Sequence, residues 1–328
     1  MKIGITLGDP LGIGPEVVVK ALADPKLAGR VRFVLYGSPI VLQAAMELVG
    51  VKKFSPNIIL VDSLSLQRRG LGRGPAARTS PNPLLCKEGD KKKQAGHLAI
   101  SSVRLATEAA LRGDIAAIVT APLNKHHAHL AGFKFPGHTE YLAALTGTKT
   151  YRMMMAGPTL KVTLATIHEP LAKVPGLLTI QNLLETITLT HRELRRLFKI
   201  KKPKIAVAGL NPHAGEEGLF GQEERKIITP AVRKARQQNI RVEGPFPPDT
   251  IFRRVVAGEF DAIIALYHDQ GLIPLKLLHF AEAVNITLGL PIIRTSVDHG
   301  TAEDIAWQGI ADPTNMKAAI NMAINLAL

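Results

Sequence analysis

The sequence predicts an α/β fold in which helices cover both faces of a largely parallel sheet. Short β-type apolar runs alternate with longer stretches of helical periodicity, which is typical of strand–helix–strand units. The chain has 328 residues, of which 46% are hydrophobic, so it is long enough for two domains or one large α/β unit. No apolar run approaches the roughly 18 residues that a membrane-spanning helix needs.

The first part of the chain alternates regularly. An apolar run at residues 2–7 is expected to form a strand, and residues 16–22 are expected to begin the first helix. Further strands are expected at 31–36, 58–61 and 116–120, and further helices at 41–48 and 98–112.

The second part repeats the alternation. The helix expected at 180–198 carries Arg195, Arg196 and Lys199 in its last turn, where cations are favourable at the negative end of the helix dipole. Strands are expected at 152–155, 161–167, 205–210 and 262–267, and the remaining helices at 223–238, 301–308 and 316–326.

Residues 68–93 interrupt the pattern. They are rich in Gly, Pro, Arg and Lys and have no usable period, so we interpret them as a basic surface insertion. The insertion contains the only cysteine, Cys86, which excludes an internal disulfide and indicates a reducing compartment. Since Asp9 cuts the apolar N-terminal stretch short, we expect no export signal and a cytoplasmic protein.

The formal net charge of +14 comes mainly from two short segments. Residues 68–93 hold eight basic and two acidic residues, and residues 192–204 hold seven basic and one acidic. Only 5% of the residues are aromatic, which leaves little surface for base stacking. We therefore interpret the basic segments as two solvated faces and expect neither nucleic acid nor a membrane as a partner.

Three separate apolar strands are each followed by a histidine: His168, His213 and His268. In open α/β sheets ligands bind beyond the carboxyl ends of the strands, and three imidazoles with open positions can hold a catalytic divalent metal. The alternative is that each is a satisfied polar residue at a strand end. The spacings of 45 and 55 residues match no local zinc motif.

The glycine-rich segment from Gly8 to Glu16 follows the first strand. It lacks the third glycine of a dinucleotide fingerprint, since Val17 stands there, and no Gly-Lys-Ser/Thr of a P-loop follows. Two interpretations remain open, a tight turn with Pro15 at the first helical position and a loop that lines a ligand cleft.

Anion contacts have several candidates. The segment Gly137-His138-Thr139-Glu140 either presents imidazole, hydroxyl and backbone N–H groups to a phosphate or is a simple helix cap with Thr139 as the cap residue. Lys276 and Arg294 are isolated cations near apolar stretches, and each is either paired or partly exposed, or binds a ligand. Residues 298–301, followed by Asp304, are typical of a capped helix start or of a loop that holds a dinucleotide phosphate.

Seven motifs in a fixed order then identify a family. They cover nearly the whole chain except about residues 64–95, and together they resemble the 4-hydroxythreonine-4-phosphate dehydrogenases of pyridoxal 5′-phosphate (vitamin B6) biosynthesis. The motifs are GDPLGIGPE, TAPLNK, GHTEYL, LATIHEPL, GLNPHAGE, YHDQGLIPLK and NITLGLPIIRTSVDHGTA.

The resemblance implies a fold like that of isocitrate and isopropylmalate dehydrogenases, with two α/β/α domains and a cleft between them. The first domain would comprise residues 1–127 and 283–328 and the second residues 128–282. A homodimer with its active site at the subunit interface is also implied.

The resemblance also assigns roles to residues. The implied metal ligands, for zinc, magnesium or cobalt, are His168, His213 and His268, with His268 of the partner subunit completing each site. The implied substrate contacts are His138, Thr139, Lys276, Asn285 and Arg294. The implied contacts to NAD or NADP are Asn285, Gly289, Asp298, His299, Gly300 and Thr301. The implied catalytic residues are His138, Asp249 and Lys276.

The implied reaction is the NAD- and metal-dependent oxidation of 4-phosphooxy-L-threonine to 2-amino-3-oxo-4-phosphooxybutanoate, which decarboxylates to 3-amino-2-oxopropyl phosphate. The nearest alternative applies the same chemistry to 4-phospho-D-threonate or 4-phospho-D-erythronate. Two further alternatives are a non-redox enzyme such as a phosphate acyltransferase and a basic nucleic-acid-binding protein.

Overall fold

The computed structural model describes residues 1–54, 57–63 and 88–328, and these form two compact units. Unit 1 consists of Met1–Lys149 and Leu290–Leu328, and unit 2 consists of Thr150–Gly289. The family resemblance implies divisions near residues 127 and 283, and these stay a prediction. Helix α5 (Lys125–Leu130) belongs to unit 1 and packs on α4 (Glu88–Leu111), where Gly96 leaves room for the backbone of His127.

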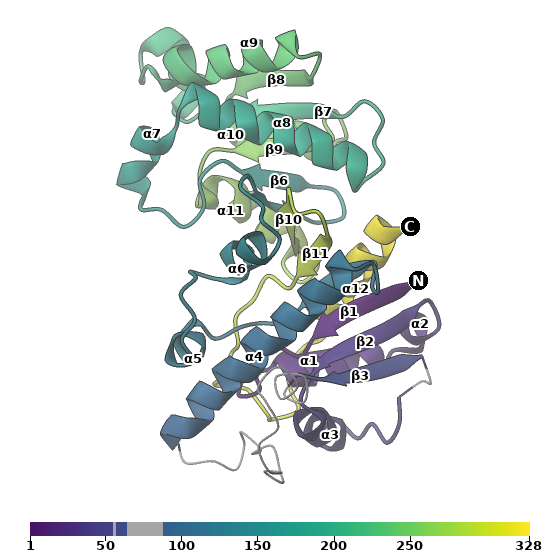
Figure 1. Cartoon of the computed structure of the whole chain (residues 1–328). Coiled ribbons are helices and arrows are strands. Elements are labelled where there is room, and N and C mark those ends of the chain that lie inside the picture. The colour runs from purple at the N-terminus through teal and green to yellow at the C-terminus, as the bar shows by residue number, and fades with distance from the viewer. Residues whose placement is uncertain (55–56, 64–87) are drawn as a thin grey trace. The chain divides into compact units, whose positions relative to one another are not determined.

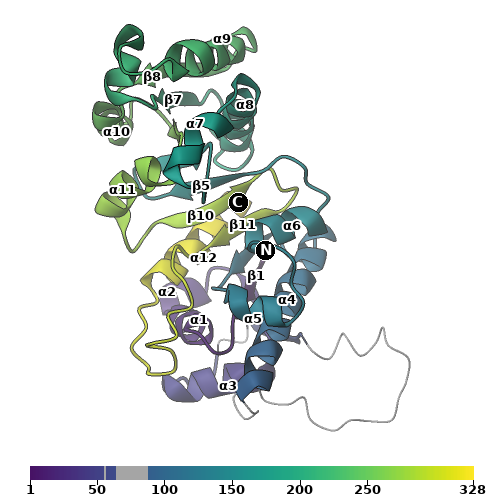
Figure 2. The same ribbon diagram turned by 90° about the vertical axis from the view of Figure 1, so that its left-hand side faces the viewer.

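The sheet of unit 1 is parallel throughout, in the order β3-β2-β1-β4-β11. Its long helix α4 packs on one face, and α1 and α12 lie on the other (Figures 1 and 2). The strands are β1 (Lys2–Thr6), β2 (Arg32–Gly37), β3 (Ile58–Asp62), β4 (Ala117–Thr120) and β11 (Ile293–Ser296). The helices are α1 (Gly14–Leu22), α2 (Pro25–Ala28), α3 (Pro39–Leu48), α4 (Glu88–Leu111), α5 (Lys125–Leu130), α6 (His138–Leu145) and α12 (Thr314–Ala327).

The sheet of unit 2 has the order β10-β5-β6-β9-β7-β8. Strand β5 is antiparallel to both of its neighbours, and the other pairs are parallel. The strands are β5 (Arg152–Ala156), β6 (Lys161–Leu164), β7 (Lys204–Ala208), β8 (Arg241–Phe246), β9 (Ala262–Ala265) and β10 (Val284–Leu288). The α-helices are α7 (Val174–Leu177), α8 (Ile180–Arg196), α9 (Thr229–Gln237), α10 (Pro248–Val256) and α11 (His268–His279), with shorter helices η2 (Leu171–Lys173), η3 (Pro212–Gly218) and η4 (Glu224–Ile228).

The faces of this sheet are covered by different helices. Helix α8 lies on one face, and α10 and α11 lie on the other (Figure 2). Fully buried apolar side chains such as Leu164, Ile263 and Leu275 form the core between the sheet and α10 and α11. The predicted α/β class with a largely parallel sheet is confirmed.

Two predicted elements differ from the structure. Residues 301–308 form turns rather than a helix, because tertiary hydrogen bonds hold them: Ile13 N–H donates to Thr301 O and Trp307 Nε1 donates to Pro10 O. Helix α4 begins at Glu88, so the last six residues assigned to the basic insertion are helical. The rest of that insertion, with Cys86, lies outside the described residues.

Within the described part of the chain, no helix is both long enough and apolar enough to cross a membrane.

Candidate active site

The three histidines of unit 2 follow three neighbouring parallel strands. Strand β9 pairs with β6 on one side and with β7 on the other, so the carboxyl ends of these strands meet at one edge of the sheet. His168 lies four residues after β6, His268 is the first residue of α11 after β9, and His213 lies in η3 after β7. The prediction that all three follow strand ends is thus confirmed.

Two of these histidines are in contact. The ring centroids of His168 and His268 lie 5.5 Å apart, a separation at which two imidazole nitrogens can share one ion at about 2.0–2.1 Å each. His268 Nδ1 lies 2.6 Å from Asp269 Oδ1, a contact that directs the other ring nitrogen outward for binding.

The third histidine is held differently. The ring of His213 packs 6.1 Å from that of Phe220. Among the described residues, no group of three or more His, Cys, Asp or Glu side chains is spaced to hold a metal ion. The chain therefore brings together two of the three predicted ligands, and both of these, including His268, belong to the same chain.

Unit 1 carries a buried cation at the carboxyl end of its sheet. Arg294, on β11, is 2% exposed, and its Nε and Nη2 donate to Thr120 Oγ1 at 3.1 and 2.8 Å. Burial lowers the pKa of Arg294 to about 10, an effect that the nearby Glu140 carboxylate partly opposes. At neutral pH the side chain thus stays positively charged in a low-dielectric environment that favours an anion.

His138 lies beside this arginine. Burial, and next the charge of Arg294, lowers the pKa of His138 to about 3, so its imidazole is neutral at physiological pH. The residue is half-buried, but its Nε2 atom is buried and has no hydrogen-bond partner in the described ranges. A buried polar atom without a partner is costly, which indicates that a ligand completes the contact.

Helix α6 begins at His138, with Gly137 as its N-cap and no side chain capping its first turn. The interpretation of Thr139 as the cap residue is therefore wrong, because Thr139 lies inside the helix. The free N–H groups of this turn are consistent with the alternative, an anion site built with His138 and Arg294.

The glycine-rich segment after β1 packs against the loop that follows β11. Helix α1 begins at Gly14, so Pro15 is its second residue rather than its first, and both interpretations of the segment stay open. Gly12 also lies against Thr301: a Cβ on Gly12 would stand 2.8 Å from the Cβ of Thr301 and 2.9 Å from its carbonyl oxygen, so any side chain there would displace the loop. The segment thus supports the predicted cofactor loop from behind.

A buried acid–base pair lies under the same loop. Asp9 is fully buried, with Oδ2 at 2.9 Å from His127 Nδ1 and Oδ1 accepting the N–H of Leu11. Burial raises the pKa of Asp9, although these two contacts and the charge of His127 oppose the rise. On its other side His127 Nε2 lies 3.9 Å from Glu303 Oε1, which also accepts from Asn124 Nδ2.

The other predicted residues are placed as follows. Asp249 is exposed in the first turn of α10, and Lys276 on α11 is half-buried over the Phe280 ring. Asn285 on β10 has a buried Oδ1 without a partner in the described residues, and Gly289 follows that strand with φ of +94°. In the loop after β11, His299 Nδ1 contacts Gly300 O at 3.0 Å. The other ring nitrogen of His299, Nε2, is buried and has no partner among the described residues. The N–H of Asp298 donates to Asn315 Oδ1.

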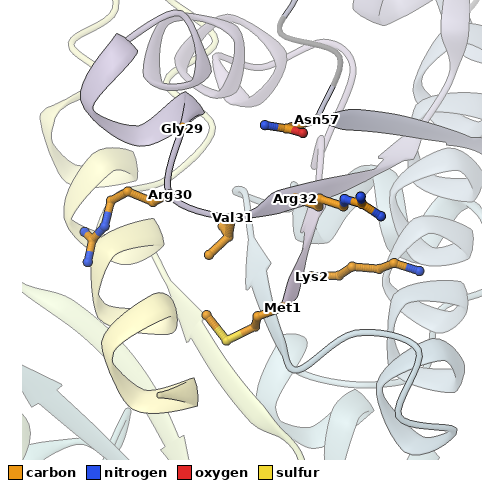
Figure 3. A pocket seen from close by; sticks show the side chains of 7 residues that line it. All are labelled: Met1, Lys2, Gly29, Arg30, Val31, Arg32 and Asn57. Atoms are coloured by element: carbon orange, nitrogen blue, oxygen red, sulfur yellow. The ribbon is translucent and has the colours of Figure 1, made fainter.

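A cavity of about 380 Å³ lies away from all of these residues, at the amino ends of β1 and β2 (Figure 3). Lys2 and Arg32 are register partners on these strands, and their side chains extend to the same side, while Arg30 points the opposite way. The cavity contains no predicted site residue.

Two residues that the sequence analysis does not name hold the histidine loops. Glu224 is buried and accepts the N–H groups of Leu210 and Asn211, just before His213. Gln270, two residues after His268, donates to Gly209 O. Gln270 stands within the motif YHDQGLIPLK, but nothing in a sequence pattern distinguishes a buried bridging amide from an exposed one.

Comparison with known proteins agrees with the motifs. The family model described as pyridoxal phosphate biosynthetic protein PdxA matches residues 30–323. The chain is 49% identical to a 4-hydroxythreonine-4-phosphate dehydrogenase of Desulfosudis oleivorans (99% of this chain, 96% of the relative). It is 45% identical to a D-threonate 4-phosphate dehydrogenase of Salmonella typhimurium (99% and 98%).

A solved structure agrees as well. The crystal structure of 4-hydroxythreonine-4-phosphate dehydrogenase from Klebsiella pneumoniae superposes with a TM-score of 0.85 at 42% identity, covering 100% of this chain and 99% of that one. The chain therefore belongs to the PdxA family of pyridoxal phosphate biosynthetic proteins and is an oxidoreductase of the dehydrogenase type.

Proposed function

We propose that the protein oxidises 4-phosphooxy-L-threonine with NAD and a divalent metal ion, giving 2-amino-3-oxo-4-phosphooxybutanoate, which decarboxylates to 3-amino-2-oxopropyl phosphate. The observation that carries the proposal is the 49% identity, over nearly the whole chain, to a relative named for this substrate. A second candidate is 4-phospho-D-threonate, because a relative at 45% identity is named for it.

The unit 1 edge fits a phosphate group. Arg294 would supply a buried cation, His138 Nε2–H a neutral donor, and the first turn of α6 with Thr139 further donors. Because Arg294 is already fixed by Thr120, little side-chain entropy is lost when the anion binds.

The unit 2 histidines fit a divalent metal ion. His168 and His268 lie at a suitable separation in one chain, and His213 would be the third ligand. A bound cation would favour loss of the proton from the substrate hydroxyl. Imidazole ligands suit zinc and cobalt, and magnesium stays a further candidate.

The redox step then needs a proton acceptor and a hydride acceptor. NAD would supply the acceptor for the C3 hydrogen and its two bonding electrons, and the hydroxyl proton would leave to a base. Asp249 and His138 are the candidate bases for this proton. Lys276 would fix the anionic end of the substrate and orient C3.

The proposed cofactor contacts are Asp298, His299, Gly300 and Thr301 in unit 1, and Asn285 and Gly289 in unit 2. The buried, unpartnered Nε2 of His299 and Oδ1 of Asn285 are polar atoms that a dinucleotide could satisfy. In the described part of the chain, no atom beyond Gly300 and its two chain neighbours lies within 4 Å of the position that a Cβ on Gly300 would take, and this open space leaves room for a phosphate. We assign NAD, with NADP as the alternative.

A second copy of the chain would cover the outer face of α11. Ile273, Leu277 and Phe280 are exposed and recur at helical spacing on the helix that begins with His268. An exposed apolar stripe of this kind favours a protein partner. We therefore include a homodimer, located in the cytoplasm, in the proposal.

The test is NAD reduction by the purified protein with 4-phosphooxy-L-threonine and, in parallel, 4-phospho-D-threonate, each with and without a chelator. We expect NADH formation that is fastest with the threonine derivative and is abolished by the chelator. Faster turnover of the threonate would favour the second candidate. No NADH with either compound would overturn the proposal, and activity that survives the chelator would remove the metal from it.

A further inference from the structure

We propose that Glu224 and Gln270 are positioning residues that set His213 in place relative to His168 and His268. The inference rests on the proposed function, because it takes the three histidines as metal ligands. It adds two residues that lie outside the predicted ligand set and act only through the backbone of the ligand loops.

The segment that carries His213 has an unusual backbone. Residues 213–217 all have positive φ angles between 39° and 83°, and only Gly215 among them is a glycine. Side-chain-bearing residues in the left-handed region are strained, so a run of them persists only where surrounding contacts hold it. The orientation of the His213 side chain depends on this turn.

Glu224 supplies those contacts. Its Oε1 accepts the N–H groups of Leu210 and Asn211, both at 2.8 Å, and its Oε2 accepts from Asn211 Nδ2 at 2.9 Å. The carboxylate also packs against the turn, since a Cβ on Gly215 would stand 2.6 Å from its Oε2.

The burial of Glu224 indicates a geometric role. Its exposed fraction is 3%, and in the described ranges it forms no ion pair with a lysine or arginine. A buried carboxylate held only by neutral donors is an expensive way to stabilise a fold. It is an effective way to fix a loop, because one carboxylate accepts several N–H groups in a defined geometry.

Gln270 extends this support to the other two loops. Its Oε1 accepts the N–H of Leu266 and its Nε2 donates to Gly209 O, both at 2.7 Å. On the far side Thr166 Oγ1 donates to Leu266 O at 2.7 Å. A continuous polar chain therefore runs from Thr166, two residues before His168, through Gln270, two residues after His268, to the loop of His213.

The bridging residues thus connect the three strand ends that carry the predicted ligands. Residues that orient metal ligands from behind contribute about 10–100-fold to metal affinity. Substitution at Glu224 or Gln270 should therefore weaken metal binding while the fold stays intact.

The experiment is a Co²⁺ titration of the full-length, metal-free protein, followed by the visible absorption of the bound ion. The variants are E224Q and Q270E. E224Q keeps the two backbone contacts but sets the introduced amide N–H₂ group against that of Asn211. Q270E keeps the acceptor for Leu266 but loses the donor to Gly209. The matched control is E223Q, because Glu223 is half-buried and also accepts from Asn211 Nδ2.

We expect E224Q and Q270E to raise the Kd for Co²⁺ at least tenfold and to alter the absorption band, with E223Q within twofold of wild type. Unfolding midpoints of the metal-free variants separate positioning from a general loss of stability. Wild-type Kd and spectrum in both variants would overturn the inference, as would a rise in Kd that only matches a loss of folding. If H213A binds Co²⁺ as tightly as wild type, the ligand assignment itself fails, and the inference falls with it.

Discussion

The carboxyl ends of the strands are built on different principles in the two units. In unit 1 this edge buries charges: Arg294 lies against Thr120, and Asp9 pairs with His127 under the loop after β11. In unit 2 the same edge buries neutral amide contacts and one carboxylate, Glu224, and it leaves its imidazoles at the surface of the unit.

The difference matches the two kinds of ligand proposed. A phosphate needs fixed donors and a cation in a dry environment, and unit 1 provides these within the chain. A metal ion needs donor atoms that converge from several loops, and unit 2 provides two histidines in contact and a third, His213, on a strained turn. Unit 1 therefore has its cation already fixed and leaves His138 Nε2 for the ligand, whereas unit 2 has two of its three predicted ligands in contact.

The largest effect is expected from removing His213 in unit 2. H213A should lose bound metal and lower kcat/KM at least about 10³-fold, which corresponds to about 4 kcal/mol of transition-state stabilisation. Metal content by elemental analysis and steady-state NADH formation check this. The control is H191A, because His191 is also half-buried but lies on α8, away from the strand ends. Wild-type metal content and activity in H213A would refute the assignment of His213 as a ligand.

The next effect is expected from the buried pair of unit 1, and it should appear as stability. H127A leaves the Asp9 carboxyl group buried without its ring partner. Breaking a buried pair in this way should lower the free energy of unfolding by about 3–5 kcal/mol. H127N should recover part of this loss, because its amide can still donate to Asp9. Urea unfolding measures both variants.

The control for this pair is R104A, which breaks the exposed pair between Arg104 and Glu108 and should change stability by at most about 0.5 kcal/mol. If H127A and R104A have equal effects, the description of the unit 1 edge as charge-stabilised is wrong.

The sequence predicts those parts of the fold and site that follow from local pattern. Periodicity predicts strands β1 to β7, strand β9 and most long helices, but it does not predict β8, β10 or β11, the strand that carries Arg294. The three histidines follow from the rule that parallel strands expose their carboxyl ends at one edge. The bridging roles of Glu224 and Gln270 cannot be predicted from the sequence. Glu224 bonds to a residue 14 positions away and Gln270 to one 61 positions away, and contacts over such distances produce no periodic pattern in the sequence.

The helix expected at 301–308 does not form, again because of hydrogen bonds between residues that lie far apart in the sequence. Its residues have helical spacing, but the contacts of Thr301 with Ile13 and of Trp307 with Pro10 hold a different backbone, with φ of +62° at Trp307. Tertiary hydrogen bonds override local propensity in this loop, as they do in the turn of His213.

The smallest expected effect is a pH dependence of the stability of unit 1, which comes from His138. The pKa of His138 lies near 3 in the folded chain and near 6.5 when unfolded, so below about pH 6.5 only the unfolded chain takes up this proton. The contribution of His138 to stability is therefore full above that pH and falls by up to about 1.4 kcal/mol per unit towards pH 3.

Urea unfolding of wild type and H138Q at pH 7 and pH 5 isolates the contribution of His138 to the free energy of unfolding, since Gln does not titrate. Wild type should lose more stability than H138Q on acidification. Inorganic phosphate should reduce the difference, because an anion beside Nε2 favours the protonated ring and raises its pKa. A difference that phosphate leaves unchanged would mean that His138 is buried for packing alone, and the unit 1 edge would then lose its neutral donor for the anion.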